Sequence, residues 1–443
     1  MDRCKGLHFY INISNFDKVV LEEEQWSGSV NHSIHELDTF FSCIEVFGKE
    51  HFPDRFHVEK VTGSRLHMYV LGDIKDSFTV VAEVSIFANR LTSYLNKEVS
   101  KYKMLINFAI QIGASYGTFY DFTFKTQDVE EETSIGFAAN YAAKLQGLSE
   151  KAHISISSNI FEILDDSYKS VFRCLKSGKI RKFDQDYYAT ALINDLRSII
   201  DITIDLEKAR KYANTLNLTD IVFSEARQKV DFSLLSKKSC KKLYGIPFYS
   251  DVRGFTEQFE EDDSNLEEMA YKTQRILTSM YSTVMEIGGV HIQFQGDREE
   301  ALFHNYGEYN CIEDAVQAGL RIIDKVQEFQ VSVGIGESIG RLFATKIGAR
   351  GEKDNILLGS TVTTADHFED ELADKNQLVI ATEIYEYLRT NKPLWAENFR
   401  KIRDIEAYRT TIGYKKLLLQ AQEKQVEKDT LQNNYNGAWR KLD

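Results

Sequence analysis

Hydrophobic and polar positions along the chain change between a period of two and a period near 3.6, and one order of elements occurs twice. Alternating runs bounded by glycine and polar residues predict strands, and apolar residues at helical spacing predict helices. The first half is read in this order: strand 9–16, helix 33–47, hairpin 57–71, helix 77–96, strand 106–117 and helix 138–146.

The second half repeats that order. From Leu266 to Ile287 the apolar residues recur at helical spacing, and Gly288-Gly289 ends the helix, as glycine commonly does. The elements are strand 248–252, helix 266–287, hairpin 291–303, helix 312–328, strand 331–340 and a turn at Gly359. Such an alternation, with a hairpin in each unit, predicts an α/β fold of the α+β sandwich kind with a mixed sheet in each half.

The repeat predicts two tandem domains, at 1–184 and 241–400. The segment between them, 185–240, is charged and periodic, and we expect a helical connector. The tail 401–443 is rich in Lys, Gln and Glu and is expected to be helical. It would be either a solvated appendage or a contact for a second copy of the chain.

Composition narrows the class of protein. The 443 residues carry a net charge of −13, which argues against broad binding to nucleic acid. The five cysteines form no CxxC pair, so neither a disulfide framework nor a zinc site is indicated. The N-terminus has no apolar leader, and no apolar run is long enough to span a bilayer. We therefore expect no membrane contact and a cytoplasmic location.

Two carboxylates in the second half are candidate metal ligands. Asp251 ends a predicted strand, and Asp297 lies at the tight turn of the hairpin. Either one alone fits an ordinary turn or a helix cap. Both in register, without Cys or His companions, fit Mg²⁺ or Mn²⁺, and a pair of such ions suits phosphoryl transfer.

The residues after Asp251 are candidates for binding a triphosphate. A backbone with a glycine at position 254 can approach a ligand closely and present its N–H groups to phosphate oxygens. The candidates are Val252, Gly254, Phe255 and Thr256.

The matching segment of the first half, Glu131–Leu145, offers Asn140 and Lys144 instead of carboxylates. Asparagine is disfavoured inside an Ala-rich helix, which indicates a function for Asn140. Lys144 alone fits an exposed helix lysine equally well. Each half lacks the groups that the other half keeps.

The combined pattern resembles the class III nucleotidyl cyclases, the adenylate and guanylate cyclase family. The second half has Asp251-Val-Arg-Gly-Phe-Thr256, then Gly288-Gly289 before Gly296-Asp297, then Gly359-Ser-Thr-Val362. The first half matches less closely, in the same order. The resemblance covers most of residues 5–183 and 245–390.

The resemblance implies a pseudo-heterodimer of head-to-tail domains with one composite site. Asp251 and Asp297 align with the ligands of two metal ions, and Asn140 aligns with the asparagine that orients the ribose. Lys144 aligns with an arginine that stabilises charge on the reacting phosphate, and it lacks the planar fork of that arginine. The pseudo-symmetry of the two halves also creates a second site, here called the mate site. Its residues at the corresponding positions are Asn12, Ser64, Thr363 and His367. The implied reaction turns a nucleoside triphosphate into a 3′,5′-cyclic nucleotide and pyrophosphate.

The base-reading pair of the family aligns with Lys60 and Thr133. The lysine ammonium only donates hydrogen bonds, whereas threonine both donates and accepts. Guanine fits least, because guanylate cyclases resemble one another in having an acidic residue at the lysine position. The pair by itself resembles an adenylate cyclase.

The Phe248–Thr256 opening, the missing arginine and the lack of sensor domains resemble the bacterial pyrimidine cyclases of Pycsar anti-phage systems. We therefore expect a cytidylate cyclase first and a uridylate cyclase second. Three alternatives remain: an adenylate cyclase, a nucleotide sensor without turnover, and a scaffold whose first half is a decayed regulatory domain.

Overall fold

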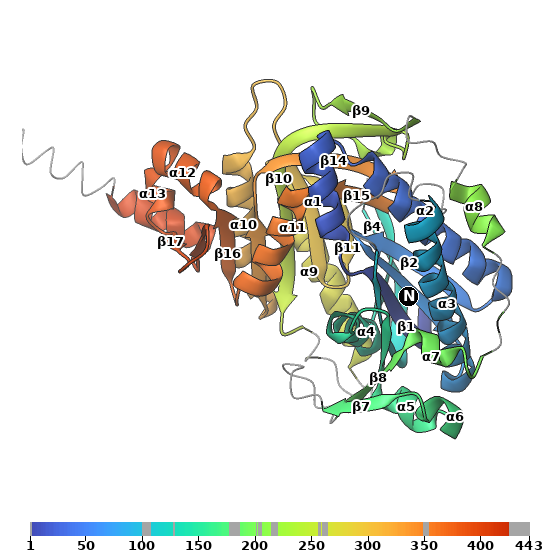
Figure 1. Cartoon of the computed structure of the whole chain (residues 1–443). Helices are drawn as coiled ribbons and strands as arrows, with labels where there is room; N and C mark the ends of the chain where they lie inside the picture. Colours follow the sequence, from blue (N-terminus) through green and yellow to red (C-terminus); the bar gives the residue numbers. More distant parts are fainter. Residues whose placement is uncertain are drawn as a thin grey trace, which may run out of the picture.

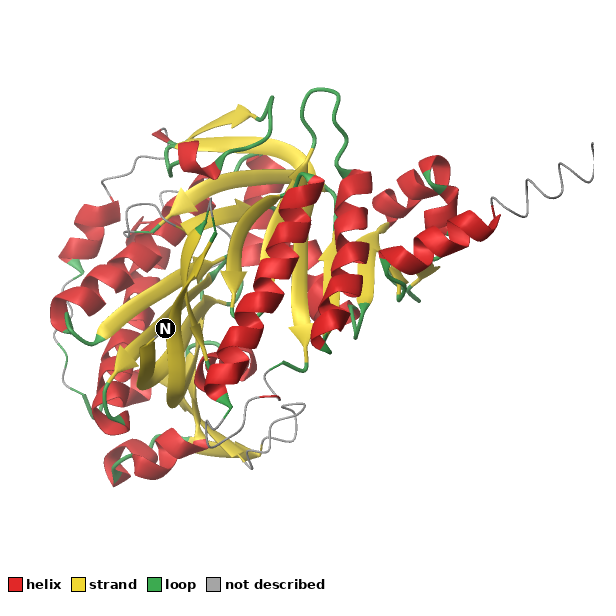
Figure 2. Ribbon diagram, turned by 180° about the vertical axis from the view of Figure 1, so that it is seen from behind, coloured by secondary structure: helices red, strands yellow, loops and turns green. Residues whose placement is uncertain are grey.

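A computed structural model describes two mixed β-sheets that lie side by side, each with its own long helices (Figures 1 and 2). It describes residues 2–99, 108–126, 129–176, 187–200, 202, 206–213, 220–255, 258, 265–348 and 354–424. In that part of the chain, no helix is both long and apolar enough to cross a membrane.

The first sheet has the strand order β2-β3-β1-β4-β6-β8-β7, with β5 paired to β4. Its strands are β1 Asp2–Ile13, β2 Phe56–Thr62, β3 Arg65–Leu71, β4 Ile110–Lys125, β5 Glu130–Ile135, β6 His153–Ser157, β7 Arg173–Lys176 and β8 Tyr187–Leu192. The helices of this part are α1 Phe16–Ser27, α2 Asn31–His51, α3 Ile74–Tyr94, α4 Phe137–Leu148, α5 Ser158–Ile163, α6 Asp166–Lys169, α7 Ile193–Leu196 and α8 Glu207–Ala213.

The second sheet has the order β11-β12-β10-β13-β16-β18-β17, which repeats the first strand for strand. Its strands are β9 Val222–Glu225, β10 Ser239–Arg253, β11 Val290–Gln295, β12 Arg298–His304, β13 Ser332–Glu337, β14 Gly340–Ile347, β15 Asp354–Leu358, β16 Gln377–Ala381, β17 Arg400–Lys401 and β18 Ala407–Thr410. The helices are α9 Leu266–Ile287, α10 Ile312–Val326, α11 Ser360–His367, α12 Thr382–Asn391 and α13 Pro393–Ala396. One strand pair in each path, β4–β6 and β13–β16, is parallel, so the predicted mixed, duplicated fold is confirmed.

Local sequence signals set the predicted end of α9 and the start of α3, which begins three residues before the predicted helix 77–96. Helix α9 ends at Gly288, whose φ of +100° is costly for other residues, and the N–H of Gly289 donates to the Val284 carbonyl over 2.9 Å. Helix α3 begins after Asp73, whose carboxylate accepts from the N–H groups of Lys75 and Asp76, each at 3.1 Å.

Each half extends a β-arm that completes the core of the other half. The β4–β5 arm of the first half carries Phe122, Phe124 and Ile135 into the hydrophobic core of the second. The β14–β15 arm carries apolar residues in the opposite direction, namely Phe343, Ile347, Ile356 and Leu358. Burying one such side chain stabilises by about 1.5–3 kcal/mol, so the arms hold the two halves face to face.

The connector and tail differ from the prediction of helix throughout. Within 185–240, residues 207–213 are helical, but 187–192 form a strand of the first sheet and 222–225 a strand of the second. Within the tail, 407–410 is a strand and 414–424 is helical. Strand pairing across the sheet edges overrides the helical periodicity of these segments.

Candidate active site

The two candidate metal carboxylates lie at the same end of neighbouring strands. Asp251 is near the end of β10 and pairs in register with Arg298 on β12. Asp297 precedes Arg298 in the turn between β11 and β12. Both aspartates are partly buried.

Burial and mutual repulsion shape the electrostatics of this pair. Burial raises the pKa of Asp251, while Arg253 and Arg298 lower it. Burial and the neighbouring Asp251 raise the pKa of Asp297 well above its usual range. Two carboxylates that destabilise each other's charged form are relieved by a hard cation, so the donors fit Mg²⁺ or Mn²⁺.

Two arginines and a buried glutamate form an ionic network that reaches Asp251 through Arg253, and the sequence analysis predicted none of the three. Arg253 donates to Asp251 over 2.9 Å and pairs with Glu369 at 2.5 Å. Arg298 pairs with the other oxygen of Glu369 at 2.7 Å and lies 4.4 Å from the centroid of the Tyr249 ring. The available signal was an arginine within two positions after each aspartate.

The structure brings Asn140 and Lys144 to these carboxylates from the other half of the chain. A Cβ on Gly296 would lie 3.3 Å from Asn140 Oδ1, so the amide touches the turn that carries Asp297. Lys144, one helical turn further along α4, lowers the pKa of both Asp251 and Asp297 by its charge. Side chains four residues apart share one helix face, which here faces the aspartates.

The predicted base-reading pair lies on β2 and β5. Lys60 is 4% exposed, and its Nζ donates to Glu131 Oε1 over 2.5 Å and to the Phe294 carbonyl over 2.6 Å. An ammonium group has three donors, and two of those of Lys60 are used by the described residues. Thr133 is fully buried, and its hydroxyl has no hydrogen-bond partner among the described residues. Lys60 borders a cavity, whereas Thr133 is enclosed by the residues that the structure describes.

Glu131 forms an ionic cluster between the halves that the sequence reading also missed. Besides Lys60, it accepts from the N–H of Phe294 at 2.9 Å and pairs with His291 at 3.3 Å. His291 also pairs with Glu299 at 3.3 Å. Burial lowers the pKa of His291, but its bonds to the two glutamates outweigh burial and raise it to about 9. The cluster therefore joins β5 of one half to β11 of the other.

A cavity of about 740 Å³ opens beside Lys60, between the two halves. It is lined by Lys60, Glu131 and His291, by α9 residues and by 229–233 of the connector, and it stops short of both metal aspartates. The two carboxylates, the Asn140 amide and the Lys144 ammonium lie together at the aspartates, whereas the cavity borders only Lys60 among the predicted site residues.

The predicted triphosphate loop is placed only in part. Val252 and Phe255 are 3% and 2% exposed, with their side chains in the core of the second half. Gly254 has a φ of +70°. With these side chains buried, only backbone groups of these residues could face a ligand. Thr256 lies outside the described residues.

The mate site lacks the carboxylates at the two metal positions. The β2–β3 turn, Gly63-Ser64, matches the Gly296-Asp297 turn, and both glycines have positive φ. The Ser64 hydroxyl donates to Asn12 Oδ1 over 2.8 Å, so these two groups satisfy each other. An amide bonded to a hydroxyl is a poor substitute for two carboxylates as a cation site.

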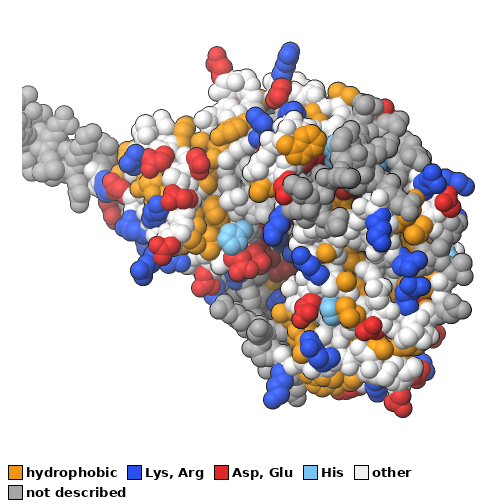
Figure 3. All heavy atoms as spheres, viewed as in Figure 1, with side chains coloured by type: hydrophobic (Ala, Val, Ile, Leu, Met, Phe, Trp, Pro, Cys, Tyr) orange, Lys and Arg blue, Asp and Glu red, His pale blue; other side chains and the backbone are white. Residues whose placement is uncertain are grey.

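Charged side chains are interspersed on the molecular surface. On the face shown in Figure 3, the described Lys and Arg side chains are scattered among Asp, Glu and hydrophobic groups and form no continuous basic strip.

The chain is similar to known proteins in sequence and in fold. No family model matches the chain. A uridylate cyclase from a Rhizobium species is 21% identical over 386 residues, which make up 79% of this chain and 72% of that protein. The crystal structure of a class III adenylyl cyclase-like ATP-binding protein from Pseudomonas aeruginosa superimposes with a TM-score of 0.73, at 14% identity, over 95% of this chain and 90% of that one. The chain thus has the class III nucleotidyl cyclase fold, and the resemblance inferred from its motifs is confirmed.

Proposed function

We propose that the protein is a nucleotidyl cyclase that converts a pyrimidine nucleoside triphosphate into its 3′,5′-cyclic monophosphate and pyrophosphate. The observation that carries the proposal is the meeting of Asn140 and Lys144 from one half with Asp251 and Asp297 from the other. The mate site lacks the metal carboxylates, which supports one composite site per chain.

The residues suggest a division of work. Asp251 and Asp297 would hold the cations, which when bound supply charge neutralisation at the phosphates and a more acidic hydroxyl. Asn140 would orient the ribose so that its 3′-oxygen faces the α-phosphorus. That oxygen bonds to phosphorus while its proton passes to solvent, and the bond from phosphorus to the pyrophosphate leaving group breaks. Lys144 would stabilise the charge that develops on the phosphoryl oxygens.

Lys60 and Thr133, which by themselves resemble the pair of an adenylate cyclase, can also accommodate a pyrimidine. Uracil presents two carbonyl acceptors and one N–H donor, so the ammonium of Lys60 and the hydroxyl of Thr133 can serve it. Cytosine offers a carbonyl and a ring nitrogen to the same groups. The sequence alone predicts a cytidylate cyclase first and a uridylate cyclase second. We propose uridine as the preferred nucleoside of the substrate, because the relative found by sequence is named a uridylate cyclase.

One assay tests the proposal. Purified protein is incubated with each of ATP, GTP, CTP and UTP in the presence of Mn²⁺, and cyclic products are separated by chromatography. We expect a pyrimidine product, which the Asp297→Ala variant fails to make. The absence of product from all four substrates would refute cyclase activity.

A nucleotide-binding protein without turnover is the second candidate. The exposed Lys144 at the arginine position favours it, and so does the name of the Pseudomonas neighbour, an ATP-binding protein. This second candidate predicts that calorimetry detects nucleotide binding while no cyclic nucleotide is formed.

An anti-phage signalling role belongs to the proposal through the Pycsar resemblance. Phage plaque counts on bacteria that express the native system, with Asp297→Ala as control, test that role. Equal plaque counts with the two proteins would exclude it.

A further inference from the structure

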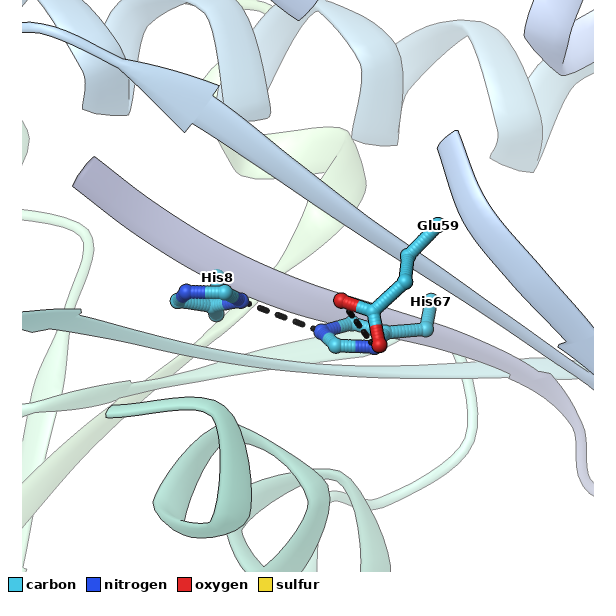
Figure 4. A group of neighbouring side chains, drawn as sticks. All are labelled: His8, Glu59 and His67. Atoms are coloured by element: carbon cyan, nitrogen blue, oxygen red, sulfur yellow. Dashed lines mark hydrogen bonds and ion pairs between the residues drawn. The ribbon is translucent and has the colours of Figure 1, made fainter. Parts of the chain in front are cut away.

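A buried chain of polar contacts runs through the first half from His8 to Ser134, and Figure 4 shows its members His8, His67 and Glu59. His8 Nδ1 lies 3.1 Å from His67 Nε2, and His67 Nδ1 lies 3.2 Å from Glu59 Oε2. Glu59 accepts from the Ser134 hydroxyl through one oxygen and from the Ser134 N–H, at 3.2 Å, through the other. All four side chains are at most 6% exposed.

The two ends of the Glu59–Ser134 link are sequence neighbours of the base-reading pair. Glu59 precedes Lys60 on β2, and Ser134 follows Thr133 on β5. Glu59 is the extra residue of a β-bulge, since Val58 pairs with Met68 and Lys60 with His67. A bulge re-aims side chains, and here both Glu59 and Lys60 become buried. The link therefore fixes the spacing of the strands that present Lys60 and Thr133.

The second half keeps the bulge and lacks the chain. Its β11 has the same irregularity between His291 and Gln293, and the extra residue there is the apolar Ile292. By strand register, the positions of His8 and His67 are taken by Pro247 and Glu300. The bulge thus forms without an acid, so Glu59 and its histidines serve something particular to the base-reading half.

Resting on the proposed function, we propose that Glu59, Ser134 and His67 are positioning residues that hold Lys60 and Thr133 at the spacing required to select the base. One ring nitrogen of His67 faces Glu59 and the other faces His8, and this pair of contacts keeps the carboxylate in one orientation. Burial and His67 lower the pKa of His8 to about 3. His8 is therefore neutral and ends the chain.

A transition-metal site is the competing interpretation of the same residues. His8, Glu59 and His67 each have a ligand atom within 4.8 Å of the others. The hydrogen-bond interpretation is favoured because both oxygens of Glu59 are already engaged by Ser134, and one of them also by His67.

The test compares Ser134→Ala with Ser134→Thr, which keeps the hydroxyl. Rates are measured with all four nucleoside triphosphates. For Ser134→Ala we expect KM for the preferred substrate to rise about ten-fold, equivalent to about 1.4 kcal/mol. The preference over the next substrate should shrink, with kcat within about two-fold of wild type. Ser134→Thr should restore KM and the preference.

The matched control is Ser85→Ala, which removes an equally buried hydroxyl that bonds only within its own helix, to the Val81 carbonyl. It should leave KM and the substrate preference unchanged. If Ser134→Ala has a much lower Tm than the wild type, His67→Gln serves as the second variant. It should weaken the substrate preference in the same direction.

Three results would overturn the inference: wild-type KM and preference in Ser134→Ala, an equal loss of kcat for every substrate, or stoichiometric metal that His67→Gln removes. If the wild type makes no cyclic product, the proposed function fails separately. Calorimetric Kd values for the four nucleotides then test the same variants. No change in the relative affinities would sink the positioning role.

Discussion

Replacing Asp297 with asparagine should stabilise the metal-free protein while it abolishes turnover. Burial and Asp251 raise the pKa of Asp297 well above its usual range, so the folded protein disfavours its charged form. The neutral amide has nearly the same shape and removes the repulsion. Active sites commonly lose stability in this way for the sake of function.

The magnitude follows from the charges around the pair. Two like charges 4 Å apart repel by about 4 kcal/mol at an effective dielectric constant of about 20. Arg298 and Arg253, the latter 2.9 Å from Asp251, offset part of this. We therefore expect a net gain of roughly 1–2 kcal/mol, or a Tm increase of a few degrees at about 2–4 °C per kcal/mol.

Thermal melts with and without Mn²⁺ check the reasoning. A cation at 100 times its Kd stabilises a protein by about 2.7 kcal/mol. Mn²⁺ should therefore raise the Tm of the wild type and leave the Tm of the Asp297→Asn variant nearly unchanged. Because the folded pKa is raised, the stability from neutral Asp297 is complete at low pH and declines as pH rises through that pKa. In the Asp297→Asn variant, stability should no longer decline with pH in this way. If the metal-free variant has a lower Tm than the metal-free wild type, the repulsion between Asp251 and Asp297 is contradicted.

Three further changes test the composite site. Asn140→Ala should lower kcat by roughly 10²-fold without changing the melt, since it removes one preorganised hydrogen bond, and initial rates check this. Lys144→Arg should raise kcat/KM roughly three- to ten-fold, because a guanidinium holds two phosphoryl oxygens, and a fall would count against its place at the phosphate. The raised pKa of His291, about 9, makes its ionic stabilisation complete below about pH 6.5 and lost as pH rises through about 9. Glu131→Gln should remove the part of this dependence that Glu131 supplies, leave the part from Glu299, and cost about 3 kcal/mol in denaturant melts at neutral pH.

The sequence predicted the parts of the site that rest on local signals. Gly-Asp at a hairpin turn, Asp251 at a strand end and Asn140 in an Ala-rich helix each stand out in a short window. Their meeting across the halves followed from the resemblance and not from any spacing along the chain.

The missed parts depend on contacts between distant residues. Glu131 reads as one acid in the run Glu130–Glu132, and only the fold sets it between Lys60 and His291. The serine at 134 and the glutamate at 59 are likewise ordinary strand residues until β5 and β2 come together. Local periodicity carries no information about such pairs, and it also misassigned strand 187–192 as helix.

The exchanged arms predict that the two halves unfold together. Phe124 belongs to the first half and is 1% exposed in the core of the second, where its ring centroid lies 4.5 Å from that of Phe294. Phe124→Ala should cost about 3–5 kcal/mol, as for other buried aromatic truncations. If the arms couple the halves, calorimetry will show one transition that shifts as a whole, and turnover will fall because the arm carries Thr133 on β5. Two transitions, of which only one moves, would mean that each half is stable alone and that the composite site depends on docking between preformed domains.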